Sequence, residues 1–383
     1  ASQHVQVPTR GLALFINAFN FPSWGLWEKA APALLAGVPV VVKPATATAW
    51  LTQRMVKDVV EAGVLPEGAL NIVCGSSAGL LDALQPFDVL SFTGSADHAA
   101  LLRRHPAVAE RSVRVNIEAD SVNSALLMPG ATPGSPAFDL LVKEVAREMT
   151  QKSGQKCTAI RRVFVPESVY DAAAEAIGAR LAKTTVGNPR NEAVRMGALV
   201  SREQLRSVQD GLAQLQGEAQ ILFDGRGAAF IDADQAVAAC HAPVLLGRRD
   251  ADSADVLHRT EVFGPVATLM AYRDRAQAEA LVERGEGSLA CSLYGEDSAE
   301  AAAALAGTAL NLAASHGRVH VITPDVAALH SGHGNVMPQS LHGGPGRAGG
   351  GEELGGLRAL NFYHRRAAVQ ASASVLTRLT PVA

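Results

Sequence analysis

The sequence predicts an α/β fold, and two observations indicate it. First, short apolar runs rich in β-branched residues, such as 12–16 and 38–44, are separated by a segment with helical spacing over 24–37. This alternation is typical of a parallel sheet covered by helices on its faces. Second, polar residues of catalytic type follow several of the predicted strands, at the sheet edge where such folds bind their ligands.

Composition narrows the class of protein. The chain has 383 residues, which suggests two domains at roughly 100–200 residues each. A net charge of −3, without long runs of one sign, argues against nucleic-acid and membrane-surface binding. Four scattered cysteines do not form a disulfide framework and favour a reducing, cytoplasmic location. No apolar run reaches the roughly 18–20 residues that span a bilayer, and the first ten residues lack a signal-peptide core.

The first 120 residues alternate regularly. The helix over 24–37 is expected to end at Gly37, because glycine readily adopts the left-handed conformation that closes a helix. Further helices are predicted over 50–63, 77–85 and 96–105, and further strands over 69–75, 87–94 and 113–118.

The remainder is predicted to continue the pattern. In the helix over 138–150, Phe138, Leu141, Val145 and Met149 share one face. A strand follows over 161–166 and a helix within 169–187, residues 216–255 are less regular, and alternation returns over 261–272 and 276–295. The glycine-rich segment 342–356 contains charged residues and runs into an apolar stretch. It is therefore expected to be an ordered loop that passes close to a ligand or another backbone segment.

Four strand ends carry residues of catalytic type. They are Asn20, Lys43, the pair Gly94 and Ser95, and Glu118. Each has an ordinary explanation, since Asn20 can cap a helix and Lys43 or Glu118 can be solvated surface groups. Their joint recurrence favours function. Backbone N–H groups after Gly94 would face a pyrophosphate, and Lys43 would meet ribose or phosphate oxygens, although no G-x-G-x-x-G motif is present.

Cys157 is the candidate nucleophile. It follows a helical segment in a polar stretch with Lys152 and Lys156 nearby, which favours the reactive thiolate. With Asn20 and Glu118 it forms a coherent set. The thiolate would attack a carbonyl, the Asn20 amide and the Cys157 backbone N–H would stabilise the oxyanion, and Glu118 would activate a water. A nearby nicotinamide would accept hydride.

These motifs resemble the aldehyde dehydrogenase superfamily. The segments "NFP", "VVVKPAT", "FTGS", "GQKC", "EVFGP" and "GGGEELGG" occur in the family's order over residues 11–365, with Glu118 between the third and the fourth. Within the superfamily, the sequence resembles the 3,4-dehydroadipyl-CoA semialdehyde dehydrogenases of benzoyl-CoA catabolism. It also resembles the aldehyde dehydrogenase half of the ring-opening enzymes of phenylacetyl-CoA catabolism.

The resemblance implies a role for each matching residue. Cys157 corresponds to the nucleophile, Glu118 to the general base and Asn20 to the oxyanion-hole amide. Lys43 corresponds to the lysine at the adenosine ribose, Ser95, after Gly94, to the serine at the pyrophosphate, and Glu261 and Phe263 to the pair that holds the nicotinamide ribose and ring. Many NAD-using relatives have glutamate at position 46. Thr46 removes that charge and favours NADP, with NAD as the alternative.

The resemblance also implies a Rossmann-type cofactor domain and an α/β catalytic domain. The expected boundaries are 1–10 for a remnant of the oligomerisation hairpin, 11–121 for a partial cofactor domain, 122–340 for the catalytic domain and 341–383 for the glycine-rich loop and oligomerisation tail. The implied partners are a CoA-linked aldehyde substrate and, in the full-length form, a second copy in a homodimer. The sequence departs from the family at "EADSV" after the base and at Ala99, and an N-terminal part is expected to be missing.

Two alternatives remain open. A cysteine acyl hydrolase or transferase would need a histidine base beside Cys157, and no such pairing is evident in the sequence. A non-catalytic remnant of an aldehyde dehydrogenase is the other. A cluster of histidines, His316, His320, His330, His333 and His342, is expected to lie near a CoA-linked or phosphate-bearing substrate, and no metal site is expected. Cys74, Cys240 and Cys291 are expected to be buried packing residues.

Overall fold

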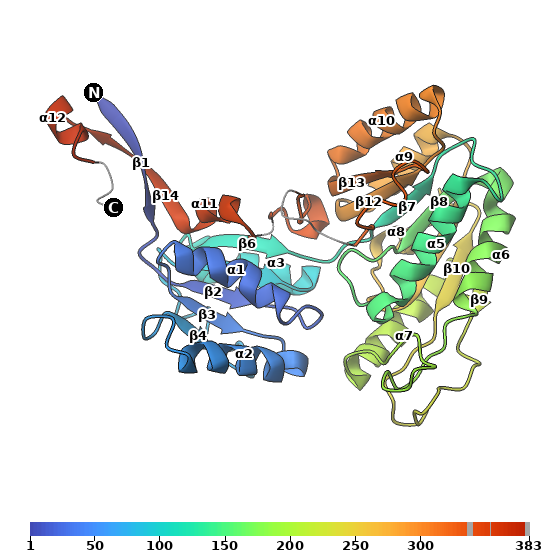
Figure 1. The fold of residues 1–383 in the computed structure, drawn as a ribbon, viewed down its shortest axis with the longest axis horizontal. Coiled ribbons are helices and arrows are strands. Elements are labelled where there is room, and N and C mark those ends of the chain that lie inside the picture. The colour runs from blue at the N-terminus through green and yellow to red at the C-terminus, as the bar shows by residue number, and fades with distance from the viewer. Residues whose placement is uncertain (335–339, 353, 380–383) are drawn as a thin grey trace. The chain divides into compact units, whose positions relative to one another are not determined.

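The computed structural model describes residues 1–334, 340–352 and 354–379, which form two compact units (Figure 1). The first unit comprises Ala1–Ile117 with Glu352–Ala383, and the second comprises Glu118–Gly351. Each is built around a largely parallel sheet covered by helices, which confirms the predicted α/β class. The assignment of cofactor binding to one and catalysis to the other stays a prediction.

The first unit contains a five-stranded sheet in the order β4-β3-β2-β5-β6. Its strands are β2 (Ala13–Ile16), β3 (Val40–Lys43), β4 (Leu70–Ile72), β5 (Val89–Thr93) and β6 (Arg114–Glu118). The central β2 pairs in parallel with both β3 and β5, so the chain builds outward on one side and then on the other. The strand order therefore reverses between β2 and β5. Open parallel sheets bind nucleotides at such a reversal, outside the carboxyl ends of the strands.

Helices cover this sheet much as expected. They are α1 (Trp24–Leu35), α2 (Ala49–Glu61), α3 (Ala96–Arg104) and α4 (Pro106–Ala109), joined from the C-terminal segment by α11 (Leu360–Tyr363). The short α12 (Ala373–Leu376) has no buried residue and lies away from this sheet, beside the ends of the chain (Figure 1). As predicted, α1 ends just before Gly37, whose φ of 76° is left-handed. The prediction of a helix over 77–85 is wrong. These residues form successive turns, and Gly79 at φ 78° interrupts any helical run.

The two ends of the chain meet in a separate ribbon. Strand β1 (Ser2–Pro8) pairs antiparallel with β14 (His364–Gln370), and most residues of both strands are exposed (Figure 1). The predicted role of this region in forming a homodimer stays a prediction.

The second unit contains a seven-stranded sheet in the order β13-β12-β7-β8-β11-β10-β9. Its strands are β7 (Ser124–Leu127), β8 (Arg162–Pro166), β9 (Gln220–Asp224), β10 (Val244–Arg248), β11 (Val266–Tyr272), β12 (Ser288–Tyr294) and β13 (His316–Ile322). All neighbouring strands are parallel except β9 and β10, which are antiparallel. Residues 216–255 are less regular, as predicted, because only the five-residue strands β9 and β10 interrupt a stretch of turns and loops.

The helices of this unit are α5 (Pro136–Thr150), α6 (Tyr170–Leu181), α7 (Arg202–Gln216), α8 (Val256–Arg259), α9 (Arg275–Glu283) and α10 (Ala299–Ala313). Figure 1 shows α5 and α6 side by side over the sheet. The predicted apolar face of α5 is buried, with Phe138, Leu141, Val145 and Met149 at most 3% exposed. This packing anchors α5, and the chain leaving its C-terminal end carries Cys157.

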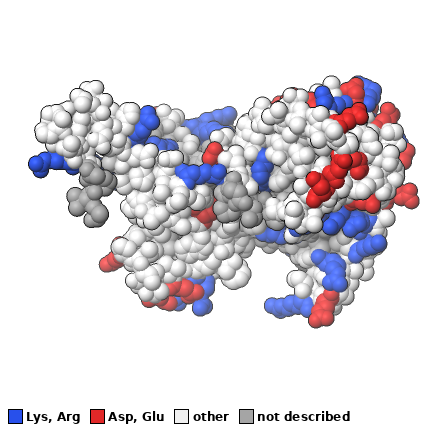
Figure 2. Space-filling model, turned by 45° about the horizontal axis from the view of Figure 1, so that its top comes forward, with Lys and Arg blue, Asp and Glu red and all other residues white. Residues whose placement is uncertain are grey.

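Basic and acidic side chains are interspersed among uncharged residues over the face shown in Figure 2. Among the described residues, no helix is both long and apolar enough to cross a membrane.

Candidate active site

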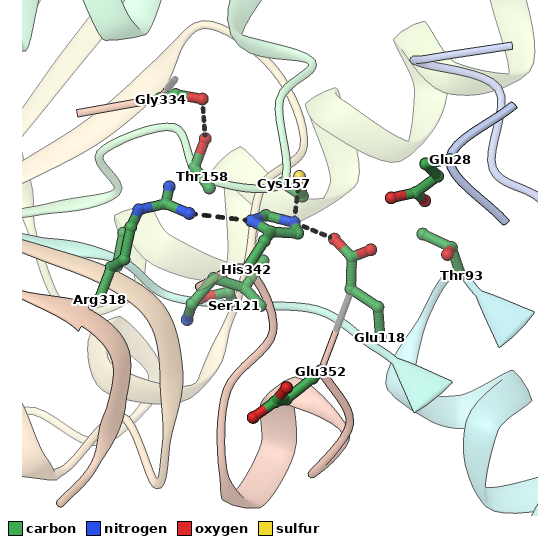
Figure 3. A network of polar contacts seen from close by, with 12 residues as sticks. Glu28, Thr93, Glu118, Ser121, Cys157, Thr158, Arg318, Gly334, His342 and Glu352 are labelled. Carbon is green, nitrogen blue, oxygen red and sulfur yellow. Dashed lines mark hydrogen bonds and ion pairs between the residues drawn. The ribbon is translucent and has the colours of Figure 1, made fainter. Parts of the chain in front are cut away.

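Three reactive side chains of the second unit converge on one point (Figure 3). Glu118 ends β6, Cys157 lies in the loop between α5 and β8, and His342 belongs to the glycine-rich segment. The Cys157 Sγ atom, a Glu118 carboxylate oxygen and a His342 ring nitrogen all lie within 4.8 Å of one another. Two of the three were predicted from the sequence as nucleophile and base, and the histidine was not.

The loop before Cys157 has an unusual backbone. After α5 a short 3-10 turn (Gln151–Gly154) carries three consecutive left-handed residues, with φ 54° at Lys152, 56° at Ser153 and 69° at Gly154. A Cβ atom at Gly154 would lie 2.2 Å from the Gly264 carbonyl oxygen, so only glycine fits there. This explains the Gly-Gln-Lys step before the cysteine.

Asn123 fixes the backbone of Cys157 itself. Its side-chain amide donates to the Cys157 carbonyl at 2.8 Å and to the Ala159 carbonyl at 3.1 Å. Its oxygen accepts from the Ser121 hydroxyl at 2.7 Å and from the Ala290 N–H at 2.9 Å. The segment "EADSVNS", which departs from the family pattern after Glu118, therefore supplies the residues that hold the nucleophile loop.

Arg161 ties the same loop to the "EVFGP" segment. The guanidinium is buried and donates to the carbonyls of Gly154 and Gly264, both at 2.8 Å. It also lies 5.4 Å from the centre of the Phe263 ring, and its Nε lies 3.6 Å from Glu261 Oε1. Glu261 and Phe263, predicted to contact the nicotinamide end of the cofactor, are thus held by the arginine that braces the Cys157 loop.

Lys156 does not act as the sequence suggested. Its ammonium group is buried, with Glu148 Oε1 at 2.7 Å and Gln151 Oε1 at 2.9 Å. The expectation that this lysine favours a Cys157 thiolate is therefore wrong, because the ammonium already has a buried carboxylate partner. Lys152, by contrast, interacts electrostatically with the Cys157 sulfur. Burial lowers the pKa of Lys152, and a negative Cys157 opposes that effect.

Burial is also the main influence on the nucleophile. It raises the pKa of the Cys157 thiol, and the negative charge of Glu118 raises it further. His342 acts in the opposite direction, through its charge and its hydrogen bond to the sulfur. Within the second unit, His342 is therefore the neighbour that most strongly lowers the pKa of Cys157.

His342 contacts both reactive groups through one nitrogen. Its Nε2 lies 2.8 Å from Glu118 Oε1 and 3.7 Å from Cys157 Sγ, and its Nδ1 lies 3.2 Å from Arg318 Nη1. Figure 3 shows the ring between the arginine on one side and the carboxylate and sulfur on the other. No local pattern pairs residues 185 positions apart, and the only signal was a histidine at the start of a glycine-rich loop.

The glycine-rich loop does approach other backbone segments, as predicted. A Cβ atom at Gly344 would lie 2.3 Å from the Ser288 carbonyl oxygen, and one at Gly346 would lie 2.0 Å from that of Glu286. The loop is also fastened beside Glu118, where the Ala119 N–H donates to the Ala348 carbonyl at 2.9 Å and Arg347 pairs with Asp120. Its glycines thus let His342 reach the nucleophile.

Two opposing influences act on the pKa of His342. Burial lowers it, whereas the negative charges of Glu118 and Cys157, and their hydrogen bonds to the ring, raise it well above its usual value. The three side chains are also of types that bind zinc. A histidine bound to metal through Nε2 carries its hydrogen on Nδ1 and donates it to an acceptor. Here Nδ1 faces a guanidinium, so this contact favours the prediction that the site holds no metal.

The residues predicted to bind the dinucleotide in the first unit lie near its strand ends. Lys43 ends β3, Thr46 begins a 3-10 turn (Thr46–Thr48), and Ser95 caps α3 by accepting from the His98 N–H at 3.4 Å. A Cβ atom at Gly94 would lie 2.5 Å from the Phe92 ring, so a larger residue before this helix would displace that ring.

The end of the central strand β2 is also polar. The amide oxygen of Asn17, the residue after β2, accepts from Lys29 Nζ at 3.2 Å, and Lys29 also donates to the Thr93 hydroxyl at 2.8 Å. Asn20 follows in the same loop and is half-buried. The strand order reverses between β2 and β5, so these residues occupy the edge where nucleotides bind in such sheets.

Glu261 in the second unit carries a carboxyl oxygen that is suited to accept a hydrogen bond. Burial raises the pKa of its carboxyl to about 7, against the opposing charge of Arg161. Its Oε2 accepts from the Ser121 N–H at 3.2 Å. Its Oε1 is buried and, within the described part of the chain, accepts no hydrogen bond. Such an atom suits a ribose hydroxyl, so this residue fits the predicted cofactor role.

The other cysteines and histidines are mostly structural. Cys240 and Cys291 are buried as expected, but Cys74 is exposed because it lies in the turn after the short strand β4. Two of the clustered histidines, His316 and His320, lie on strand β13 and not in a loop, and burial lowers the pKa of each to about 4. His333 is also buried, with Nδ1 2.6 Å from the Ser292 hydroxyl.

Sequence comparisons agree with this geometry. The model of the aldehyde dehydrogenase family matches residues 2–366. The 3,4-dehydroadipyl-CoA semialdehyde dehydrogenase of Aromatoleum evansii is 57% identical over 344 residues, which cover 90% of this chain and 66% of that protein. Protein MaoC of Klebsiella aerogenes is 42% identical over 186 residues, which cover 48% of this chain and 52% of that protein. The chain therefore spans about half to two thirds of the length of these relatives.

Solved structures agree as well. The aldehyde dehydrogenase C of Pseudomonas syringae, determined with NAD+ and octanal, has a TM-score of 0.80 at 25% identity, over 96% of this chain and 70% of that one. A putative aldehyde dehydrogenase from Burkholderia cenocepacia has a TM-score of 0.80 at 27% identity, over 96% and 72%. The family match over nearly the whole chain, together with a cysteine and a glutamate at one point, shows that the chain belongs to the aldehyde dehydrogenase family.

Proposed function

We propose that this chain is the nucleotide-binding and catalytic part of an NADP-dependent dehydrogenase that oxidises a CoA-linked semialdehyde to the acid. The observation that carries the proposal is the approach of Cys157 and Glu118 to within 4.8 Å, in a chain whose family oxidises aldehydes. A nucleophile and a carboxylate base at this separation provide both halves of a covalent mechanism.

In the first half, the Cys157 thiol loses its proton to solvent, and the resulting thiolate sulfur bonds to the aldehyde carbon. The Asn20 amide and the Cys157 backbone N–H then stabilise the oxyanion of the resulting thiohemiacetal. The rigid loop built by Gly154, Asn123 and Arg161 supports this role, because it fixes the direction of the backbone N–H. A nicotinamide dinucleotide, when bound, supplies the acceptor of the hydride that leaves the same carbon.

In the second half, Glu118 takes a proton from a water molecule, whose oxygen attacks the thioester carbon. The bond between that carbon and Cys157 Sγ breaks, the sulfur leaves as a thiolate, and the acid is released. The proton that Glu118 takes from this water must pass to solvent before the next turnover. The partial exposure of the Glu118 side chain, 16%, supports such an exchange.

Each unit carries residues that the family resemblance assigns to the dinucleotide. Lys43, Thr46, Gly94 and Ser95 stand at the carboxyl edge of the first sheet, and Glu261 and Phe263 belong to the second unit. Lys43 offers a cation to a ribose 2′-phosphate, and Thr46 adds no repelling carboxylate. These two residues are the basis for NADP over NAD.

The substrate class rests on the relative at 57% identity, whose name specifies 3,4-dehydroadipyl-CoA semialdehyde. The experiment supplies the purified chain with this CoA thioester and follows the absorbance of reduced nicotinamide. Reduction of NADP only in the presence of the aldehyde supports the proposal. A chain that binds neither cofactor nor substrate is instead a non-catalytic remnant.

A cysteine acyl hydrolase is the second candidate, because His342 lies beside Cys157 as such an enzyme requires. The same preparation tests this alternative with an acyl thioester and no cofactor. Release of thiol at a rate that matches or exceeds aldehyde oxidation would favour hydrolysis over dehydrogenation.

A further inference from the structure

Arg318 determines which nitrogen of His342 carries a hydrogen. A guanidinium has only donors, so its contact with Nδ1 at 3.2 Å is a hydrogen bond only if Nδ1 accepts. A neutral ring that accepts at Nδ1 carries its single hydrogen on Nε2. That nitrogen faces Glu118 and Cys157.

The arginine is itself held firmly. It lies on β13, is 8% exposed, and donates through Nη1 to the Leu341 carbonyl at 2.9 Å and through Nε to His320 Nε2 at 3.1 Å. Its Nη2 donates to the His333 carbonyl at 3.4 Å. A turn of the His342 ring would therefore cost its hydrogen bond to Arg318 without releasing the guanidinium.

A doubly protonated ring leads to the same result at Nε2. An imidazolium carries hydrogens on both nitrogens, so Nε2 again has no lone pair to accept a proton. Only the neutral ring with its hydrogen on Nδ1 would leave Nε2 as a base. That form and the imidazolium both place an N–H against the guanidinium, but the negative charges of Glu118 and Cys157 favour the imidazolium alone. In the imidazolium and in the neutral ring with its hydrogen on Nε2, that nitrogen donates.

We propose that His342 is a positioning residue, a fixed N–H donor that holds the Glu118 carboxylate beside Cys157 and stabilises the thiolate without acting as a base. The inference rests on the proposed function for its consequence in turnover, but its geometry does not depend on it. The Nε2–H points at the carboxylate when the thiol is neutral, and it can shift to the sulfur when the thiolate forms.

Among the described residues, four charged or titratable groups act on the sulfur. Glu118 disfavours the thiolate, whereas His342, Lys152 and Arg161 favour it. Of the three favourable groups, His342 is the one whose contact with Sγ, at 3.7 Å, is a hydrogen bond. Its removal should therefore raise the pH at which Cys157 reacts, and replacement by another N–H donor should restore it.

The test compares His342→Gln, which keeps a non-titrating N–H, with His342→Leu, which keeps the volume but has no donor. Iodoacetamide labels the whole chain over pH 6–10, and mass spectrometry of peptides separates Cys157 from the exposed Cys74. We expect His342→Leu to slow Cys157 alkylation at neutral pH about tenfold, the effect of losing one hydrogen bond to a charged group. We expect the alkylation rate of His342→Gln to stay within about threefold of the original rate.

Equal losses in the Gln and Leu variants would overturn the proposal, because they would mean that a titrating imidazole is required. Unchanged alkylation in the Leu variant would overturn it as well. His258→Gln is the matched control, since it alters a second arginine-bound histidine outside the site. Thermal melting checks that each variant is folded, and Arg318→Lys gives an independent test with an intermediate loss expected. No aldehyde or cofactor is present, so a failure of the dehydrogenase proposal would leave this result interpretable.

Discussion

Two arginine–histidine pairs in the second unit share one geometry and differ in what they face. Arg162 Nη1 lies 3.1 Å from Nδ1 of His258, and Arg318 Nη1 lies 3.2 Å from Nδ1 of His342. Both arginines are buried, and both also donate to backbone carbonyls. In each pair the guanidinium makes Nδ1 an acceptor and leaves the hydrogen on Nε2.

The difference lies at Nε2. In His258 it donates to the Ala251 carbonyl at 3.1 Å, and the ring stacks on Phe164 with centres 6.3 Å apart. Burial, followed by the charge of Arg162, lowers the pKa of His258 to about 4. In His342, Nε2 meets two ionisable groups, Glu118 and Cys157. The same arginine contact at Nδ1 thus orients a structural histidine, His258, and a charge-stabilising donor, His342.

Of the variants that test this comparison, the one that removes the Cys157 sulfur should have the largest effect on activity. Cys157→Ser is expected to abolish aldehyde oxidation, because a serine hydroxyl beside Glu118 and His342 is a far weaker nucleophile than a thiolate. Cofactor affinity, measured by quenching of protein fluorescence, should remain close to that of the original chain. Retention of full activity after alkylation of Cys157 would contradict the assignment of the nucleophile.

Removal of the Glu118 carboxylate should leave the first half of the reaction intact. Glu118→Gln is expected to give a burst of reduced cofactor equal to the enzyme concentration, followed by turnover slowed about 10²–10⁴-fold. The amide cannot take a proton from the water that releases the acid. Rapid mixing measures both phases, and an equal loss of burst and steady state would move Glu118 to an earlier step.

A change in the structural pair, Arg162 and His258, should alter how the stability of the fold depends on pH and leave the reactivity of Cys157 unchanged. Below pH 6.5 an unfolded chain protonates His258, whereas the folded chain does so only near pH 4, so acid favours unfolding across this interval. The full effect is at most about 3 kcal/mol. In His258→Gln, the loss of stability between pH 7 and pH 5 should be smaller by about 2 kcal/mol, with Cys157 alkylation unchanged.

Urea unfolding at the two pH values measures this difference. His316→Gln should behave in the same way, because the pKa of His316 is also lowered to about 4. His342→Gln should not reduce the acid sensitivity, because the pKa of His342 is raised. An identical pH response in the His258 and His342 variants would break the distinction between the two pairs.

The smallest expected effect lies outside both pairs, in the first unit. Thr46→Glu should repel a ribose 2′-phosphate and offer acceptors to free ribose hydroxyls, moving the preference from NADP toward NAD by about tenfold. The ratio of kcat/KM for the two cofactors, in one buffer, is the measurement. An unchanged ratio would mean that residue 46 does not discriminate between a ribose with a 2′-phosphate and one without.

Much of this site could be predicted from local patterns in the sequence. Glu118 and Lys43 were found because they end apolar strands, and Cys157 because a polar glycine step precedes it. His342 could not be found in this way, because its contact with Cys157 depends on how a distant loop folds back. Lys156 was misjudged for a related reason. Its position in sequence suggested a partner in Cys157, but the fold supplies the buried carboxylate of Glu148.

Nitrogen NMR of the chain labelled with 15N-histidine tests the central claim most directly, with His342→Gln and His258→Gln used to assign the two rings. The shifts distinguish a nitrogen that carries hydrogen from one that does not. The account predicts hydrogen on Nε2 of both rings between pH 6 and 8, with Nδ1 of His258 an acceptor throughout. A neutral His342 with its hydrogen on Nδ1 would contradict the account, because Nε2 would then be free to act as the base of Cys157.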